Sequence, residues 1–261
     1  MSFKYGLPIE RISHTAVYQE DWFNTKKGKF SASNNGKLIS PKSHLGIFTD
    51  EAITYIENLA GEIDTGKRSQ DELFNDDINW GNAHEPEAIE WFRQNVQRFL
   101  GKPPINGSDY QIQPVLRNEH TNDTHRLIIY DEHNCCTPDA LVADYDDINK
   151  LFDISGERIR VSPLETKCPK KFHRFIKLRK CKTPEDLKKE ESKYHWQVIT
   201  QMLYTDAVDG YFCCYHPYFK VKGSIIHYRR INLTEDFNKL IQTLAHAKTE
   251  LIKTVNLLQA A

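Results

Sequence analysis

A glutamate and a lysine stand two positions apart in the segment PLETKCP, residues 163–169. Prolines bound this segment, and the apolar or β-tolerant residues between them predict a short strand. Side chains two positions apart on a strand point to the same face, so Glu165 and Lys167 are expected to lie side by side. Such a pair can be a structural ion pair, or it can act on one bound group.

Three other features offer groups that could work with this pair. Asp139 stands in CCTPDALV, at the start of another predicted strand. Glu85 directly precedes a proline at the expected start of a helix. Gln197 and Gln201 are four positions apart and share one face of a predicted helix. Each feature alone has an ordinary explanation as a turn, a helix cap or surface polar residues.

Together these residue types suit the hydrolysis of a phosphodiester. One or two Mg²⁺ ions would neutralise charge, orient the phosphate and make water nucleophilic, and Mg²⁺ prefers oxygen ligands. Asp139 and Glu165 are the expected metal ligands, with Glu85 as a third acid and the main-chain carbonyl of Thr166 as a further ligand. Lys167 would orient the attacking water or stabilise developing negative charge. Whether it acts as a general base is left open by the sequence.

Positive charge is concentrated in one segment. Residues 167–182 contain eight Lys or Arg and no Asp or Glu, although the whole chain has a formal net charge of −1. The rest of the chain holds 27 cationic and 36 acidic side chains, a net charge of −9. This distribution indicates a local contact with a polyanion. A solvated lysine-rich loop is the alternative.

Other classes of site find little support. No apolar run reaches the roughly 18 residues of a membrane span. Residues 1–5 lack the apolar run of a signal peptide, which predicts an intracellular, cytoplasmic location. The six cysteines show no C-x-x-C spacing and are expected to be buried free thiols. No phosphate loop or serine-nucleophile motif is present.

Two helices are expected in the first half of the chain. One begins at a Thr49 cap and places Ile53 on its inner side. The other covers residues 86–100, has a proline in its first turn and buries an apolar stripe that includes Phe99.

The second half alternates strands with helices. Strands are expected over residues 110–116, 125–131, 139–146, 160–168, 211–216 and 224–231. A helix is expected over 184–206, and a closing helix from Thr234 with Ile241, Ile252 and Leu258 facing inward. This order predicts an α/β fold with a mixed sheet of about five strands flanked by helices.

In order along the chain, these segments resemble the PD-(D/E)xK nuclease superfamily, and in particular its lambda-exonuclease or YqaJ-type viral recombinase family. LETKCP is similar to the family's E-(L/I)-K-C-P, CTPDALV to its S-P-D-G-L, and YHWQVITQMLYT to its glutamine-bearing helix. WGNAHEPEA resembles W-G-x-x-x-E-x-x-A, and FSASNNGKLI resembles a (T/S)-A-S segment. The likeness runs roughly from residue 20 to 216.

The resemblance implies a restriction-endonuclease-like core and a Mg²⁺-dependent exonuclease, with Mn²⁺ as an alternative ion. The enzyme would degrade one strand of linear double-stranded DNA from its 5′ end, in recombination of phage or mobile-element DNA. Asp139, Glu165 and Lys167 would be the central catalytic residues, with Glu85 as the helix-borne acid and Gln197 in support.

It also implies a basic pocket for the 5′-phosphate, built by Lys26, Ser33 and Thr137. Lys26 stands where the family usually has arginine, so a bidentate clamp would become a single charge. Members of the family often form a ring-shaped trimer and work with a single-strand annealing protein, which implies a homo-oligomer and such a partner here.

The basic segment then gains a role, because it leaves the active-site strand. Lys170, Lys171 and Arg174 would lie along the DNA backbone and make binding depend on salt.

Because no long linker divides the chain, the order of the elements predicts one domain over residues 1–261, and the resemblance makes it a nuclease domain. It would comprise a helical part with DNA-end contacts (1–80), a catalytic core (81–232) and a closing helix (233–261).

Two other functions are weighed against the exonuclease. An endonuclease on the same core, of restriction or structure-specific type, would nick a circular duplex that an exonuclease leaves intact. A non-catalytic DNA-binding relative would tend to lose the metal carboxylates or the lysine, and here Asp139, Glu165 and Lys167 are all present.

Overall fold

The computed structural model describes residues 24–69, 76–99, 111–114, 128–143 and 161–260. Its α-helices are α2 (Asp50–Thr65), α3 (Asp76–Phe99), α5 (Phe172–Lys180), α6 (Pro184–Glu190), α7 (Ser192–Tyr204) and α8 (Thr234–Gln259). Its strands are β1 (Phe30–Ser31), β2 (Gln111–Pro114), β3 (Ile128–Asp131), β4 (Asn134–Cys136), β5 (Ala140–Ala143), β6 (Val161–Lys167), β7 (Asp209–Tyr215) and β8 (Gly223–Arg229).

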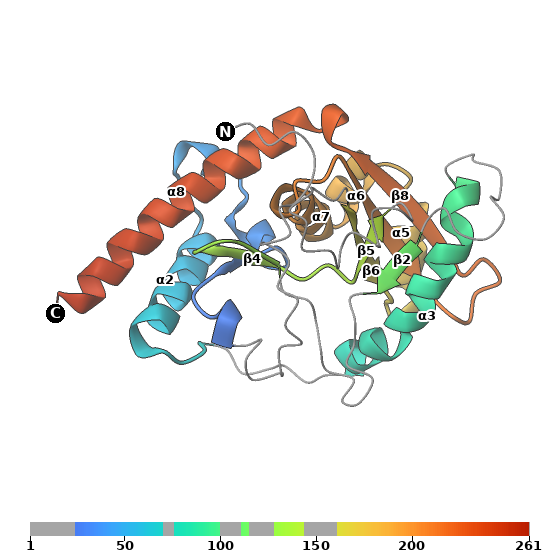
Figure 1. The fold of residues 1–261 in the computed structure, drawn as a ribbon, viewed down its shortest axis with the longest axis horizontal. Coiled ribbons are helices and arrows are strands. Elements are labelled where there is room, and N and C mark those ends of the chain that lie inside the picture. The colour runs from blue at the N-terminus through green and yellow to red at the C-terminus, as the bar shows by residue number, and fades with distance from the viewer. Residues whose placement is uncertain (1–23, 70–75, 100–110, 115–127, 144–160, 261) are drawn as a thin grey trace, which may run out of the picture.

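A five-stranded mixed sheet forms the centre of the fold and confirms the predicted class. Its strand order is β2-β5-β6-β7-β8, and only β6 and β7 pair in parallel. Helices α5, α6 and α7 make the crossover between those two strands. Figure 1 shows helices on both sides of this sheet.

The two faces of the central sheet are covered by different helices. Ile89, Phe92 and Val96 of α3 pack on one face, in a cluster that includes Leu164 of β6. The opposite face packs against α5, α6 and α7 through the larger core. Because side chains alternate along β6, Glu165 points away from α3 and toward α7.

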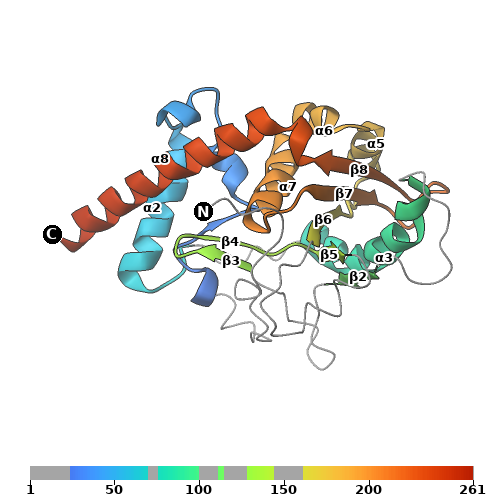
Figure 2. The same ribbon diagram turned by 45° about the horizontal axis from the view of Figure 1, so that its top comes forward.

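A smaller sheet, which the sequence did not predict, lies beside the central one. Its order is β1-β4-β3, with β1 and β4 parallel and β3 antiparallel to β4. Its strand β3 falls within the strand predicted over 125–131, whereas β1 and β4, of two and three residues, are too short to give a periodic signal. Two residues after β4 the chain reaches Pro138 and then Asp139, so this small sheet leads directly into β5. Figure 2 shows β3 and β4 between α2 and the central sheet.

The α2 and α8 helices pack against each other at one end of the molecule. Thr49 caps α2 as predicted, because its side chain accepts the main-chain N–H of Ala52 at 3.3 Å. The predicted inner side of α2 was too wide, since Ile53 is 43% exposed. The same correction applies to Ile241, Ile252 and Leu258 of α8, which are 42–45% exposed.

Helix α3 starts ten residues earlier than predicted. Asp76 and Asp77 occupy its first turn, where their charges favour the helix dipole. Pro86 therefore lies inside the helix, Glu85 belongs to its middle, and Phe99 is 46% exposed at its end. The helix forms despite the missing proline N–H because its inner face is buried on the sheet.

The basic segment was not predicted to be helical, but it forms α5. Phe175 and Leu178 are buried on one face of α5 and anchor it, while lysines and arginines occupy four of the other seven positions. The helix predicted over 184–206 is two helices, because Thr183 and Asp186 form a capping box for α6 and the chain turns at Glu191 before α7.

All six cysteines are buried and free, as predicted. In the described part of the chain no helix is long and apolar enough to cross a membrane. The division into parts 1–80, 81–232 and 233–261 stays a prediction.

Candidate active site

Glu165 and Lys167 share one face of β6, as their spacing predicted. The Lys167 ammonium donates to Glu165 Oε1, and Gln201 of α7 donates from Nε2 to Glu165 Oε2 at 2.6 Å. Glu165 is only 1% exposed. Both oxygens of a buried carboxylate are therefore held, one by a cation and one by an amide.

Asp139, directly before β5, contacts the neighbouring strand β6. Its main-chain N–H donates to Leu164 O at 3.0 Å. Its Oδ2 accepts the main-chain N–H of Thr166 at 2.6 Å and the Thr166 hydroxyl at 2.8 Å. The antiparallel pairing of β5 with β6 fixes this position, since Ala140 lies opposite Leu164.

The charges of these groups are strongly coupled. Burial, and then the negative charge of Asp139, raise the pKa of Glu165 to about 7, although Lys167 and Gln201 act in the opposite direction. Burial alone would lower the pKa of Lys167, but the charges of Glu165 and Asp139 raise it above its ordinary value. Lys167 is therefore a cation near neutral pH.

A cavity of about 420 Å³ opens over this group. Thr166 and Lys167 form part of its lining, and Glu85 of α3 lines it as well. Asp139 and Glu165 each contact one of these lining residues. The structure thus brings Glu85, Asp139, Glu165 and Lys167 to one cavity.

The remaining wall of the cavity is basic. Lys170, Lys171 and Arg174 line it from the start of α5, and Lys193 and Tyr194 line it from α7. The Lys167 ammonium lies 5.3 Å from the centre of the Tyr194 ring, which adds a cation–π contact. Five Lys or Arg residues line this cavity beside Asp77 and Glu85, and each of the five lies within 4.0 Å of a carboxylate oxygen.

The glutamine that contacts Glu165 is Gln201, not the predicted Gln197. The Gln197 side chain is half-buried and makes no hydrogen bond to the described residues, whereas Gln201 is fully buried. The two lie one turn apart on the predicted helix face, and the supporting role of Gln197 stays a prediction. Burial in the interface with β6 decides between them.

The chemistry of the donor set fits a divalent cation. In the described part of the chain no three carboxylate, imidazole or thiol groups converge on one point. Two carboxylates, Asp139 and Glu165, raise each other's energy when both are charged, as the raised pKa of Glu165 indicates. Mg²⁺ is commonly held by one or two carboxylates with water and phosphate oxygens.

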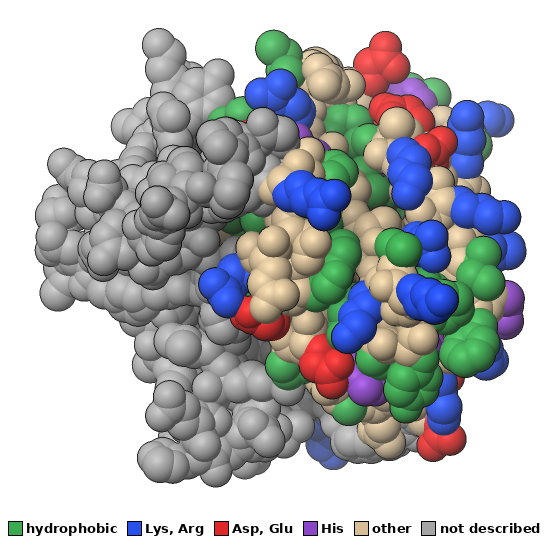
Figure 3. Space-filling view, turned by 90° about the vertical axis from the view of Figure 1, so that its right-hand side faces the viewer, with side chains coloured by type: hydrophobic (Ala, Val, Ile, Leu, Met, Phe, Trp, Pro, Cys, Tyr) green, Lys and Arg blue, Asp and Glu red, His purple; other side chains and the backbone are tan. Residues whose placement is uncertain are grey.

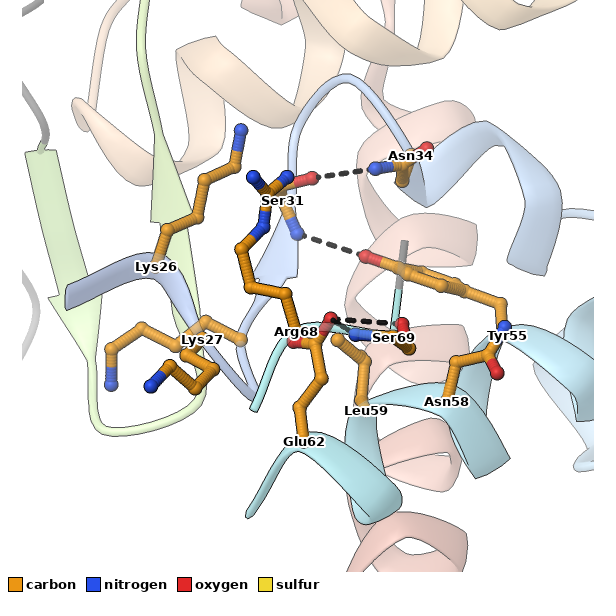
Figure 4. A pocket seen from close by; sticks show the side chains of 11 residues that line it. Lys26, Lys27, Ser31, Asn34, Tyr55, Asn58, Leu59, Glu62, Arg68 and Ser69 are labelled. Carbon is orange, nitrogen blue, oxygen red and sulfur yellow. Dashed lines mark hydrogen bonds between the residues drawn. The ribbon is translucent and has the colours of Figure 1, made fainter. Parts of the chain in front are cut away.

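A second, smaller pocket of about 90 Å³ lies between β1 and α2. Lys26, Ser31, Tyr55 and Arg68 are among its lining residues. Figure 4 shows the Lys26 ammonium and the Arg68 guanidinium pointing to the same end of the pocket, beside Ser31. Desolvation lowers the pKa of Lys26, and the positive charge of Arg68 lowers it further.

Glu62 of α2 holds the walls of this second pocket together. Its Oε2 accepts the Gly28 N–H at 2.9 Å, and its Oε1 accepts the Ser69 N–H at 3.1 Å and the Ser69 hydroxyl at 2.9 Å. Gly28 has φ of +66°, and a Cβ there would lie 2.4 Å from Ile63. Glu62 thereby fixes the chain on both sides of the pocket, next to Lys27 and to Arg68.

Three residues were predicted to form a phosphate pocket. Of these, Lys26 lines the second pocket, and Ser33 and Thr137 do not. Ser33 is exposed and its hydroxyl lies 3.3 Å from that of Ser31, which is the serine in the lining. Thr137 follows β4, and its buried hydroxyl has no hydrogen-bond partner in the described part of the chain. Arg68 escaped prediction because it lies in a short polar segment after α2, without periodicity.

The comparisons with known proteins agree with this arrangement. The YqaJ-like viral recombinase domain family matches residues 21–208, so the chain belongs to that family. This range includes the lining residues of both pockets and the elements from β1 to α7, but not β7 and β8. A search of curated protein sequences finds no match.

Solved structures show the same fold. The alkaline exonuclease LHK-Exo from Laribacter hongkongensis has a TM-score of 0.57 at 18% identity, over 93% of this chain and 100% of its own. The complex of LHK-Exo with dAMP gives 0.54 at 19% identity over the same shares. A phage-related exonuclease from Haemophilus somnus 129PT gives 0.54 at 15% identity, over 88% and 96%. The restriction-endonuclease-like fold is thereby shown.

Proposed function

We propose that the protein is a divalent-metal-dependent deoxyribonuclease that degrades linear double-stranded DNA from a 5′ end. The observation that carries the proposal is the group of Asp139, Glu165 and Lys167 beneath a basic cavity. Membership in the viral recombinase family and the fold of the exonucleases support DNA as the substrate. Recombination of phage or mobile-element DNA is the process that such an enzyme would serve.

Asp139 and Glu165 would hold the cation, for which Mg²⁺ is the first choice and Mn²⁺ the second. The main-chain carbonyl of Thr166 is a further candidate ligand. When bound, the ion would neutralise phosphate charge and make a water molecule more acidic. Gln201 keeps the Glu165 carboxylate in place.

Lys167 would act as a cation and hydrogen-bond donor rather than as a base, because its raised pKa keeps it protonated. It would orient the attacking water and stabilise negative charge that develops on the phosphate. Glu85 would contribute an acid from α3, on another side of the cavity. Lys170, Lys171 and Arg174 would bind the DNA backbone.

The second pocket would bind the 5′-terminal phosphate and so set the direction of digestion. Lys26 and Ser31 would contact the phosphate, and Arg68 would supply the guanidinium that the Lys26 position lacks. Ser33 and Thr137 stay candidates for contacts at the mouth of the pocket. A trimeric ring and an annealing partner are expected from the family resemblance, and light scattering on the purified protein would test the trimer.

One experiment tests the central claims. Linear duplex DNA with 5′-phosphate or 5′-hydroxyl ends, and closed circular DNA, are incubated with Mg²⁺ or with excess EDTA. We expect loss of the linear 5′-phosphorylated substrate only with Mg²⁺, and an intact circle. Lys167→Met should lower the rate by at least about 100-fold. Lys188→Met, which removes a lysine that lies 5.3 Å from the Trp196 ring and does not line the cavity, is the matched control and should stay within a few-fold of the wild type.

Two outcomes would contradict the proposal. Full DNA degradation in EDTA would exclude the divalent ion, and nicking of the circle would indicate an endonuclease on the same core.

A further inference from the structure

A surface beside the active-site cavity combines exposed aromatic and basic side chains that the proposed cleavage chemistry does not use. We call it the aromatic–basic surface and define it by Phe172, Tyr218, Lys220, Val221 and Lys222. Tyr218 is 71% exposed, Phe172 56% and Val221 55%. Both lysines are exposed as well. Apolar side chains this exposed, side by side, commonly mark a binding surface.

The two exposed rings rest on a buried aromatic base. The fully buried His216 lies 5.2 Å from the Phe172 ring and 5.5 Å from the Tyr218 ring, measured between centroids. The His216 Nδ1 also accepts the Tyr218 main-chain N–H at 3.3 Å. Phe219 packs edge-on against Phe172, and Trp80 of α3 does the same against Tyr218. Three elements therefore hold these rings in place before any ligand arrives.

The charge of this surface is not neutralised from within. Neither Lys220 nor Lys222 forms an ion pair with the residues that the structure describes. Lys170, in contrast, pairs with Asp76 at 3.2 Å. Figure 3 shows Lys and Arg side chains set among hydrophobic ones on this side of the molecule.

The surface is continuous with the active-site cavity. Helix α5 begins at Phe172, directly after Lys170 and Lys171, which line that cavity. A DNA strand that leaves the cavity along these lysines would therefore be able to reach Phe172.

We propose that the aromatic–basic surface binds unpaired nucleotides of DNA, with bases stacked on Phe172 and Tyr218 and phosphates near Lys220 and Lys222. Single-strand sites combine stacking aromatics with basic side chains in this way. Duplex DNA hides the faces of its bases, so the exposed rings favour a single strand. A protein partner fits less well, because lysine is depleted from protein interfaces. The proposed deoxyribonuclease activity enters only in the choice of DNA over RNA.

The test is the affinity for a labelled 20-nucleotide oligothymidine, measured by fluorescence anisotropy in EDTA. Tyr218→Ser should weaken binding by about 10-fold, because one stacking contact is lost. Tyr218→Trp should keep the wild-type affinity within about two-fold, since its ring also stacks. Ile231→Ser, at an apolar side chain that is 81% exposed, is the control for loss of exposed apolar area and should have no effect.

A second pair of variants tests the charges. The double variant Lys220→Gln/Lys222→Gln should reduce the slope of log affinity against log salt by roughly 1.4, because each phosphate contact on single strands adds about 0.7. The control Lys42→Gln/Lys248→Gln changes the net charge equally. Lys42 directly precedes the short helix η3 (Ser43–Leu45) and Lys248 lies on α8, in a different region of the molecule. It should leave the slope unchanged.

These outcomes separate the inference from the proposed function, because no cleavage occurs in EDTA. If Tyr218→Ser, folded by circular dichroism, binds oligothymidine like the wild type, the inference is wrong. An equal loss for a blunt hairpin duplex would also overturn it, since stacking would then not be involved. Oligothymidine binding that depends on Tyr218 in a protein without nuclease activity would overturn only the proposed function.

Discussion

Each pocket is built around a pair of like charges, and the two pairs have opposite sign. Beneath the active-site cavity, Asp139 and Glu165 lie close enough that the charge of one raises the pKa of the other. In the second pocket, Lys26 and Arg68 point to one end, and the charge of Arg68 lowers the pKa of Lys26. Each arrangement is unfavourable by itself, because like charges are held together in a partly desolvated place.

This difference indicates what each pocket is built to bind. Two carboxylates held together are relieved by a cation, and a lysine with an arginine is relieved by an anion. The neighbouring groups are consistent with this difference. Beside Lys167 and the neutral Gln201, the first group carries a net negative charge only when Glu165 is ionised. In the second pocket the Glu62 carboxylate accepts main-chain N–H groups at the edge. Predictions that remove one charge from each pocket therefore sharpen the contrast.

The largest effect is expected on the pH dependence of stability. In EDTA the folded protein keeps Glu165 protonated up to about pH 7, whereas the unfolded chain loses this proton near its ordinary pKa. The folded state binds more protons between these values, so the free energy of unfolding should fall as pH rises through that window. The expected loss is about 3 kcal/mol.

Urea unfolding at pH 5 and pH 8 measures this loss. Glu165→Gln should remove most of the decrease, while Glu57→Gln, at an exposed glutamate of α2, should leave it intact. A wild-type protein whose stability rises between pH 5 and pH 8 in EDTA would contradict the raised pKa.

A smaller effect is expected from the glutamine on α7. Gln201→Leu removes a hydrogen bond from a buried carboxylate, and such supporting contacts commonly change metal-site activity by about 10- to 100-fold. It should also move the rise of the cleavage rate to higher pH, because Gln201 lowers the pKa of Glu165. Gln197→Leu, one turn away, should change neither quantity. Equal effects of both variants would show that Gln201 has no special role.

Much of the central sheet was predictable from the sequence because β6, β7 and β8 have seven residues each, which is long enough to give a strand signal. The spacing of Glu165 and Lys167 fixed their common face, and the Pro-Asp segment placed Asp139 at a strand start. The same reasoning could not choose between Gln197 and Gln201, since periodicity gives the face of a helix and tertiary contact gives the position along it. It also missed α5, whose lysines and arginines outnumber its two buried anchors.

The second pocket shows the other limit of prediction. Lys26 and Arg68 are 42 positions apart, and the local pattern relates neither residue to the other. Their meeting depends on the small sheet, on Gly28 in a left-handed conformation and on Glu62. Such long-range contacts are decided by packing that a single sequence does not display.

The smallest expected effect tests this meeting directly. Arg68→Ala should reduce the preference for 5′-phosphate over 5′-hydroxyl ends by about 10-fold, since a charge-assisted hydrogen bond is commonly worth about 1.5–3 kcal/mol. Lys67→Ala, at the exposed neighbour, is the matched control and should keep the preference. Competition between the two linear substrates in one reaction measures the ratio without depending on total activity.

A reciprocal variant decides whether the guanidinium or its position matters. In Arg68→Ala/Lys26→Arg the guanidinium is moved to the other side of the same pocket, so the phosphate preference should recover at least in part. Recovery would mean that one planar donor at either position suffices to bind the terminal phosphate. If the preference does not recover although the variant is folded, the position of the guanidinium matters as well as its charge. Glu62 would then fix that position by holding the neighbouring Ser69. A preference that stays at the wild-type level in Arg68→Ala itself would show that the Arg68 guanidinium takes no part in 5′-end selection.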